Sequence, residues 1–472
     1  MRKTKIVCTM GPTTDDENIL RQLIEEGMDV ARLNFSHGTH EEQKRRMDTI
    51  KRLRKEMNKP IAILLDTKGP EIRTRDFEGG KVLIKEGDTF TLTPRELVGD
   101  NTIASITYEN LADDISIGTK ILIDDGLIEL EVIGINDRDI RCMVKNGGYV
   151  SNHKGINVPG IHLNMPYMSQ VDIDDILFGI EQDVDFIAAS FVRSAKDVLE
   201  IRNLLDENGG NDINIISKIE NEEGVKHIDD IIYVSDGIMV ARGDMGVEIP
   251  GEEVPVIQKM IIKKVYNAGK QVITATQMLD SMIKNPRPTR AETTDVANAI
   301  YDGTSAIMLS GETAAGAYPV EAVRTMVRIA ARTERDINYT KRFSEIDKTG
   351  SHSVTDAVCH ATCTTAIDLR AAAIIAVTKS GASARGVSKY RPECPILAGS
   401  TSDKASRQLN MSWGVIPVHL EEQKEIFELI DHAVEAGKEK GLLSIGDKVV
   451  VTAGVPLGVP GNTNMLKVQT VE

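Results

Sequence analysis

A lysine and a glutamate stand two residues apart at the end of an apolar stretch, INIISKIENEEG (residues 213–224). The isoleucines before them are β-branched and typical of a buried strand. Side chains two apart on a strand point to the same face, so Lys218 and Glu220 leave this strand on one side. Such a pair is either a structural ion pair or part of a catalytic site, and the pair taken alone favours the ion pair.

Other apolar runs of the chain also end in charged or polar side chains. The basic ones are Arg32, Arg73 and Lys218, with Lys154 from a separate segment. The acidic ones are Asp66, Glu220, Asp244 and Glu312, and the hydroxyl or amide groups are those of Asn34, Ser36, Thr67, Thr276 and Ser310. Carboxylates that gather with cationic groups suit a divalent cation that holds an anionic, phosphorylated substrate. Oxygen ligands without His or Cys favour magnesium or manganese over zinc.

Each of these positions also has an ordinary structural interpretation. The Gly-Asp turn in ARGDMG (241–246) is a common connection, and we expect a helix to start only after the loop that follows it. Ser36 fits the N-cap of a helix, and Thr276 and Ser310 fit the caps of the helices that follow them. Convergence of these side chains at one place would favour a site over isolated turns and caps.

The order of the elements predicts that convergence. Short β-rich runs alternate with amphipathic helical patterns; residues 16–27, for example, have apolar side chains at helical spacing and a glycine at the end. Eight such runs predict a closed (β/α)8 barrel, whose catalytic face lies at the carboxyl ends of the strands. They cover residues 5–11, 30–38, 61–69, 185–192, 213–221, 237–246, 271–279 and 306–313.

We assign the barrel to residues 1–70 and 169–346. Two further segments have a different pattern of apolar and polar residues. Residues 71–168 alternate apolar and polar side chains, which predicts an inserted all-β domain over the barrel mouth, a lid that carries Lys154. Residues 347–472 predict a C-terminal α/β domain with an open sheet.

The composition excludes several classes of function. The chain has 472 residues, of which 41% are hydrophobic, enough for two or three domains with their own cores. A net charge of -15 makes nucleic acid and anionic membranes poor partners. We predict no signal peptide and no transmembrane helix. The five scattered cysteines are typical of reduced thiols in a cytoplasmic protein, and for Cys359 and Cys363 packing is favoured over a metal site.

Seven longer stretches, in this order, resemble pyruvate kinases: ARLNFSHG, LLDTKGPEIRT, IISKIEN, MVARGDMGVE, TATQMLDSM, NPRPTRAETTDVANAIYDGTSAIMLSGETAAG and TKSGASARGVSKYRP. The resemblance covers essentially the whole chain and is closest in length to the compact form of the family, which has no extra C-terminal domain. It implies a glycolytic enzyme that transfers the phosphoryl group of phosphoenolpyruvate to ADP, giving ATP and pyruvate.

The resemblance also implies roles for residues. Glu220 and Asp244 would bind Mg²⁺ or Mn²⁺, and Lys218 would lie beside the transferring phosphoryl group, which makes the ion pair between Lys218 and Glu220 the minor alternative. Because a threonine hydroxyl is a weak acid, we expect the enolate to be protonated through a water relay. The family assigns that relay to Thr276, Ser310 and Glu312. The other implied substrate contacts are Arg32 and Arg73 at the phosphate, Lys154 after lid closure, the backbone amides of Gly243 and Asp244 at the carboxylate, and Thr276 beside it.

A monovalent-cation site is implied as well. Asn34, Ser36, Asp66 and Thr67 match the family's potassium ligands. Glu71 stands where, in this family, glutamate accompanies potassium dependence and lysine accompanies independence, because a lysine would supply the positive charge of the ion. We therefore expect activation by K⁺.

The C-terminal domain resembles the family's effector domain. A strand, a TKSGAS turn (378–383) and a helix can cradle a phosphate with backbone amides and hydroxyls. The loop TAGVPLGVPGNTN (452–464) lacks the Trp and Arg that accompany fructose 1,6-bisphosphate activation, so AMP or a sugar monophosphate is the favoured effector. The implied effector residues are Thr378, Lys379, Ser380, Gly381 and Ser383.

Two rival functions are open at this point. Another barrel enzyme acting on phosphoenolpyruvate or a 2-oxo acid would use the same metal and enolate chemistry without a nucleotide lid. A non-catalytic metabolite sensor would have lost site residues, and none of the matched ones is missing. By analogy with the family we expect a homotetramer.

Overall fold

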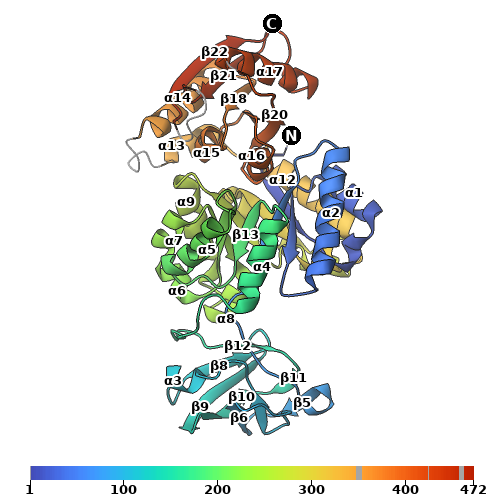
Figure 1. Cartoon of the computed structure of the whole chain (residues 1–472), viewed down its shortest axis with the longest axis vertical. Coiled ribbons are helices and arrows are strands. Elements are labelled where there is room, and N and C mark those ends of the chain that lie inside the picture. Colours follow the sequence, from blue (N-terminus) through green and yellow to red (C-terminus); the bar gives the residue numbers. More distant parts are fainter. Residues whose placement is uncertain (1, 347–352, 424, 457–461) are drawn as a thin grey trace.

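The computed structural model describes residues 2–346, 353–423, 425–456 and 462–472. The chain forms three bodies in a row, with the barrel in the middle, the inserted β domain at one end and the C-terminal α/β domain at the other (Figure 1). Two segments with predicted roles lie outside the described residues. They are residues 347–352, where we expected the C-terminal domain to begin, and residues 457–461 of the loop (452–464) whose lack of Trp and Arg disfavours fructose 1,6-bisphosphate as the effector. Within the described part of the chain, no helix is long and apolar enough to cross a membrane.

Eight parallel strands close the barrel, and each lies within one of the eight predicted runs, so the predicted (β/α)8 architecture is confirmed. Almost every residue of these strands is buried, as is typical of a parallel sheet covered on both faces. In order around the barrel they are β1 (Lys5–Thr9), β2 (Val30–Asn34), β3 (Ala62–Asp66), β13 (Phe186–Ala189), β14 (Asn214–Ile219), β15 (Gly237–Ala241), β16 (Gln271–Ala275) and β17 (Ala306–Leu309).

Helices cover the outside of the barrel and connect its strands. Three details differ from the sequence analysis. The cap of α2 is Thr39, whose hydroxyl accepts the Glu42 N–H, so the N-cap interpretation of Ser36 is wrong. Helix α8 begins at Arg242, directly after β15, without the expected loop. The helices are α1 (Glu17–Glu26), α2 (His40–Glu56), α4 (Gln170–Glu181), α5 (Ala195–Glu207), α6 (Glu222–Lys226), α7 (Ile228–Val234), α8 (Arg242–Glu248), α9 (Val254–Asn267), α10 (Arg290–Asp302), α11 (Gly311–Ala314) and α12 (Pro319–Glu334), with 3-10 turns at Pro12–Asp15 and Asp280–Ile283. Helix α13 (Tyr339–Glu345), which we assigned to the barrel, lies instead beside the C-terminal domain (Figure 1).

The inserted segment is an all-β domain apart from α3 (Leu111–Asp114) and a 3-10 turn at Glu78–Gly80, as the alternation predicts. Its larger sheet has the order β4-β12-β8-β9-β10-β6-β7, and β5 pairs with β11. The strands are β4 (Ile72–Arg73), β5 (Lys81–Ile84), β6 (Thr89–Thr93), β7 (Ile103–Ser105), β8 (Lys120–Ile123), β9 (Ile128–Asn136), β10 (Asp139–Asn146), β11 (Gly148–Ser151) and β12 (Gly155–Asn157).

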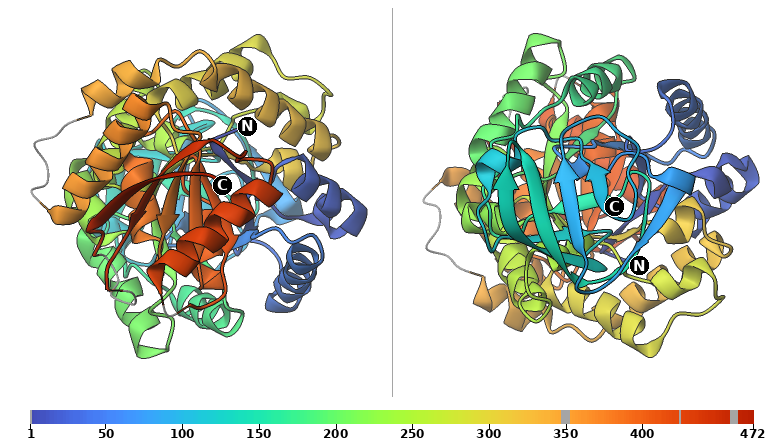
Figure 2. Two further views of the ribbon diagram at one scale, coloured as in Figure 1. Left: turned by 90° about the horizontal axis from the view of Figure 1, so that it is seen from above. Right: turned by 90° about the horizontal axis from the view of Figure 1, so that it is seen from below.

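The C-terminal domain is an open five-stranded sheet of order β20-β19-β18-β21-β22 with helices on its faces, as predicted. Its last strand is antiparallel to its neighbour, whereas the other pairs are parallel. Seen from either end, both outer domains overlie the barrel (Figure 2). The elements are α14 (Val354–Leu369), β18 (Ala373–Val377), α15 (Ala382–Lys389), β19 (Ile396–Ser400), α16 (Asp403–Leu409), β20 (Val415–His419), α17 (Ile426–Glu439), β21 (Lys448–Ala453) and β22 (Met465–Thr470).

Candidate active site at the barrel mouth

The carboxyl ends of β2, β3 and β14 bring four buried charged side chains together. Lys218 Nζ lies 3.0 Å from Asp66 Oδ1 and 3.2 Å from Glu220 Oε1. Arg32 Nε lies 2.6 Å from Asp66 Oδ2. Lys218 and Glu220 therefore do form an ion pair, which corrects its ranking as a minor alternative. The ion pair and the position at the barrel mouth occur together, because both side chains follow the same buried strand.

Burial and neighbouring charges shift the pKa values of the residues in this cluster in different directions. Burial disfavours ionised Asp66, but Arg32 and Lys218 outweigh it and hold the Asp66 pKa below its usual range. Burial likewise opposes the charge on Lys218, and the two carboxylates nevertheless raise the Lys218 pKa. Burial raises the pKa of Glu220 to about 7; Lys218 opposes this rise and the charge of Asp244 adds to it. A divalent cation between Glu220 and Asp244 would remove that repulsion.

Two residues that follow β13 complete this half of the mouth, and the sequence analysis did not single them out. Ser190 Oγ accepts a hydrogen bond from Lys218 Nζ at 2.7 Å and donates one to the Thr67 carbonyl at 2.6 Å. The Phe191 N–H donates to Glu220 Oε2 at 2.6 Å. A polar serine at the end of an apolar run was the available signal for this contact.

The ends of β15 and β16 meet through a hydroxyl group. The Gly243 N–H donates to Thr276 Oγ1 at 2.7 Å, and this hydroxyl donates to the Ala275 carbonyl at 2.6 Å. Thr276 has a φ of 68°, in the left-handed region that β-branched residues rarely adopt. Its hydroxyl caps no helix, so that interpretation is wrong, and it lies beside the glycine amide predicted to hold a substrate carboxylate.

The loops after β16 and β17 are joined by Glu312. Its two carboxylate oxygens accept the N–H groups of Leu279 at 3.0 Å and Ser310 at 2.7 Å. Ser310 precedes α11 without a capping hydrogen bond, and its buried hydroxyl has no protein partner among the described residues. The hydroxyl is thus available to a water or substrate, whereas Glu312 is already occupied with backbone groups.

The four predicted potassium ligands lie on adjacent strand ends. Asn34 and Asp66 are directly paired in the register of β2 and β3. Asn34 Oδ1 accepts the Ser36 N–H at 3.1 Å, and Thr67 Oγ1 donates to the Ala188 carbonyl at 3.3 Å. Side-chain oxygens gathered on two neighbouring strands fit a hard monovalent cation.

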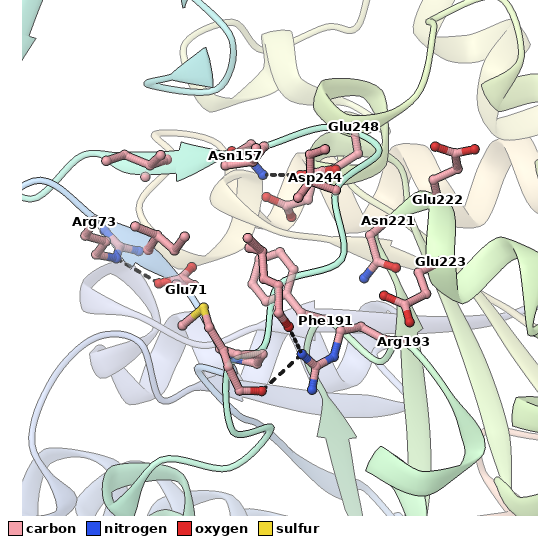
Figure 3. A pocket seen from close by; sticks show the side chains of 18 of the residues that line it. Glu71, Arg73, Asn157, Phe191, Arg193, Asn221, Glu222, Glu223, Asp244 and Glu248 are labelled. Carbon is pink, nitrogen blue, oxygen red and sulfur yellow. Dashed lines mark hydrogen bonds and ion pairs between the residues drawn. The ribbon is translucent and has the colours of Figure 1, made fainter. Parts of the chain in front are cut away.

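A cavity of about 660 Å³ lies between the inserted domain and the barrel (Figure 3). Arg73 and Lys154 line its lid side, and Asp244 lines its barrel side. Both cations are held by carboxylates: Arg73 Nε lies 2.7 Å from Glu71, and Lys154 Nζ lies 2.8 Å from Asp124. Lys218 and Glu220 do not line this cavity, but Phe191, whose N–H binds Glu220, does.

The acidic residues suit a hydrated hard cation. In the described part of the chain, no group of three or more His, Cys, Asp and Glu side chains could hold a metal ion. Glu220 and Asp244 supply two carboxylates, and Mg²⁺ commonly binds one or two carboxylates while keeping waters and taking substrate oxygens. Cys359 and Cys363 are free, buried thiols in the core of the C-terminal domain, which confirms packing as their role.

The predicted effector residues form a strand-to-helix turn in the C-terminal domain. Gly381 has a φ of 82° and precedes α15, so the absence of a side chain permits the turn. Ser383 lies in the first turn of α15, and its hydroxyl is 2.7 Å from the hydroxyl of Thr463. Thr378, Lys379 and Ser380 make up the rest of the turn after β18.

The fold and the mouth together define a (β/α)8-barrel enzyme for an anionic substrate. Comparison with known families is specific: the model described as "Pyruvate kinase, barrel domain" matches residues 1–323, and "Pyruvate kinase, alpha/beta domain" matches residues 356–469. The chain belongs to the pyruvate kinase family and is a phosphotransferase of glycolysis.

Individual relatives agree over the full length of the chain. It is 53% identical over 473 residues to a pyruvate kinase of Clostridium acetobutylicum, with both chains covered completely. It is 53% identical to that of Geobacillus stearothermophilus and 51% identical to one of Staphylococcus aureus, each alignment covering this whole chain and 80% and 81% of the relative.

Proposed function

We propose that the barrel mouth transfers the phosphoryl group of phosphoenolpyruvate to ADP, giving ATP and pyruvate. The observation that carries this proposal is the buried cluster of Lys218, Arg32 and Glu220 at the strand ends, with Asp244 beside it. Phosphoryl transfer depends mainly on positioning and on stabilising spread negative charge. A cation in a dry site does this far better than one in water.

Glu220 and Asp244 would hold a Mg²⁺ or Mn²⁺ ion, which supplies positive charge to the substrate oxygens. Arg32 and Lys218 bind and orient the phosphoryl group, and Arg73 and Lys154 meet phosphates from the lid. The amides at Gly243 and Asp244 hold the substrate carboxylate, for which the present bond from Gly243 N–H to Thr276 must be shared or replaced. The hydroxyls of Thr276 and Ser310 pass a proton to the enolate through water.

A coupled assay tests the reaction. ATP formation from phosphoenolpyruvate and ADP, measured with purified protein and Mg²⁺, is the expected result. Consumption of phosphoenolpyruvate without ATP formation would favour a lyase or mutase instead. Binding without turnover would favour a metabolite sensor.

We further propose that K⁺ activates the enzyme through Asn34, Ser36, Asp66 and Thr67. Replacing K⁺ by tetramethylammonium should lower kcat/KM at least about tenfold, equivalent to ~1.4 kcal/mol of transition-state stabilisation. Glu71→Lys should restore part of the loss, because the ammonium replaces the ion. Glu78→Lys, the same charge change on the exposed lid surface, should not. Full activity of the unaltered enzyme without K⁺ rejects the proposal.

Regulation and assembly complete the proposal. Thr378, Lys379, Ser380, Gly381 and Ser383 would bind the phosphate of AMP or a sugar monophosphate in preference to fructose 1,6-bisphosphate. The enzyme would be a cytoplasmic homotetramer, in keeping with its free thiols. Assays at subsaturating phosphoenolpyruvate with each effector, and sedimentation analysis, test these two points separately.

A further inference from the structure

Arg242 contacts several loops and helices of the barrel, and no pattern in the sequence predicts these contacts. Its side chain is 12% exposed and lies at the carboxyl ends of β15 and β16. Nη2 donates to the Thr276 carbonyl at 2.6 Å, and Nε donates to the Ala275 carbonyl at 3.1 Å. Nη1 lies 2.7 Å from Asp295 Oδ1 on α10, so the guanidinium joins three elements.

The backbone that Arg242 holds is unusual. Thr276 and Gln277 have φ values of 68° and 53°, two consecutive left-handed residues that are not glycine. Such conformations persist only where the surroundings fix them, and they cluster at functional sites. Arg242 donates to two consecutive carbonyls, those of Ala275 and Thr276. The next residue, Gly243, donates its N–H to Thr276 Oγ1.

The guanidinium of Arg242 is occupied by protein groups outside the substrate cavity. Its donors reach two carbonyls, the carboxylate of Asp295, the sulfur of Met278 at 2.8 Å and, at 3.4 Å, the amide oxygen of Gln258. It does not line the cavity between lid and barrel. A direct role in binding the phosphoryl group therefore does not fit these contacts, whereas a role in holding the turn does.

We propose that Arg242 is a positioning residue, which fixes the Thr276 hydroxyl and the Gly243 amide where the substrate carboxylate and the enolate require them. Asp295 holds the guanidinium in the orientation that reaches both carbonyls. The planar fork of arginine is needed, because a lysine ammonium cannot span the two acceptors and the carboxylate in one plane. This inference rests on the proposed function of the mouth.

The test compares Arg242→Ala, Arg242→Lys and Asp295→Asn with Arg202→Ala. Arg202 is a matched control, because it also donates to a carbonyl, that of Ile213 at 3.0 Å, and to an aspartate, Asp236 at 2.8 Å. These contacts lie at the amino ends of β14 and β15, the opposite end of the barrel from the mouth. Arg242→Ala should lower kcat/KM for phosphoenolpyruvate about 100-fold, the effect expected of a misplacement of ~1 Å. KM for ADP should stay unchanged, because the lid contacts are intact. Arg242→Lys and Asp295→Asn should lose less, and Arg202→Ala should lose nothing.

Added guanidinium supplies the readout that a purely structural role would not move. It should restore at least a several-fold part of the lost activity to Arg242→Ala and none to Arg202→Ala. Equal losses for phosphoenolpyruvate and ADP, full activity of Arg242→Lys, or failure of guanidinium to rescue a folded Arg242→Ala would overturn the proposal. If Arg242→Ala does not fold, Arg242→Lys and Asp295→Asn decide it through the two KM values. Absence of ATP formation by the unaltered enzyme would instead overturn the proposed function.

Discussion

At the scale of single residues, Asp66 organises the cations of the mouth. Its two oxygens bind Arg32 and Lys218 separately, so both cations are fixed in place by the protein alone. Ser190 adds a neutral contact to the same ammonium. Groups oriented in this way need no reorganisation when negative charge develops in the transition state, which is the main source of electrostatic catalysis.

Lys218→Met should lower kcat by about 10²–10³-fold or more, as for loss of a preorganised electrostatic group. Binding of Mn²⁺ and phosphoenolpyruvate, measured by equilibrium dialysis, should be largely retained, because Glu220 and Asp244 are unchanged. The control is Lys5→Met, which removes another buried lysine whose Nζ donates to the Val415 carbonyl at the opposite end of the barrel. Turnover by Lys218→Met at the unaltered rate would remove Lys218 from its role.

At the scale of elements, strand β15 lies so close to its neighbours at Gly237 that a side chain there would collide with them. Gly237 begins β15, and a methyl group added there would come within 2.7 Å of both the Gln271 carbonyl and the Ile216 side chain. Gly134, within lid strand β9, has no atom within 4 Å of such a methyl group. Glycine thus has a packing role in one strand and none in the other.

Gly237→Ala should lower the free energy of unfolding by about 1–3 kcal/mol, since overpacking forces the backbone or Ile216 to shift. Gly134→Ala should be neutral or stabilise by up to ~1 kcal/mol, through the reduced freedom of the unfolded chain. Thermal unfolding midpoints measured under identical conditions compare the two. A Gly237→Ala protein as stable as the parent would contradict the close approach of these strands.

At the scale of the whole molecule, the outer domains occupy opposite ends of the barrel (Figure 1). The lid lies over the carboxyl ends of the strands, and the C-terminal domain closes the amino ends. Met411, just after α16, packs with barrel residues such as Phe186 and Ile216. Arg407 Nε lies 2.6 Å from Asp185 Oδ1, and this carboxylate also accepts the Ile63 N–H at 2.8 Å.

Arg407→Met should destabilise the protein by up to about 3–5 kcal/mol at neutral pH, because it removes the nearest cation from a buried carboxylate and leaves only Arg54, 3.8 Å away. Burial already raises the pKa of Asp185, and Arg407 opposes that rise. The folded state therefore binds this proton at higher pH than the unfolded state, so the stability that Asp185 contributes falls as pH rises from the usual aspartate pKa through the folded-state pKa, and levels off above it. In Arg407→Met the Asp185 pKa should rise further, so this fall should extend to higher pH and be larger in total, and the deficit should be smaller at pH ~5 than at pH ~8.

Lys404→Met on the same helix is the matched control. Its partners Asp183 and Asp212 are mostly exposed, so the loss should be within about 1 kcal/mol and should vary little with pH. Unfolding midpoints at several pH values test the pair. Equal effects of the two substitutions would show that the contact to Asp185 is no stronger than a surface ion pair.

Local pattern determined most of the architecture. Each barrel strand carries an apolar run with a polar tip, and periods of two or 3.6 residues distinguish lid strands from barrel helices. The order of strands and helices along the chain then indicates the topology, because eight parallel strands linked by helices can form a closed sheet in few ways. The convergence of Arg32, Asp66 and Lys218 followed from their positions at strand ends, although their roles in catalysis are proposals.

Contacts between elements could not be predicted in the same way. The ion pair of Lys218 with Glu220, the Ser190 contact, the left-handed turn at Thr276 and the fork of Arg242 depend on side chains from strands and helices far apart in sequence. Their geometry is set by strand register and helix packing, which no local pattern specifies. The sequence by itself therefore determined most of the charged residues that reach the mouth. The tertiary structure added Ser190 and Phe191 and decided which side chains touch, because distances between elements arise only when the barrel closes.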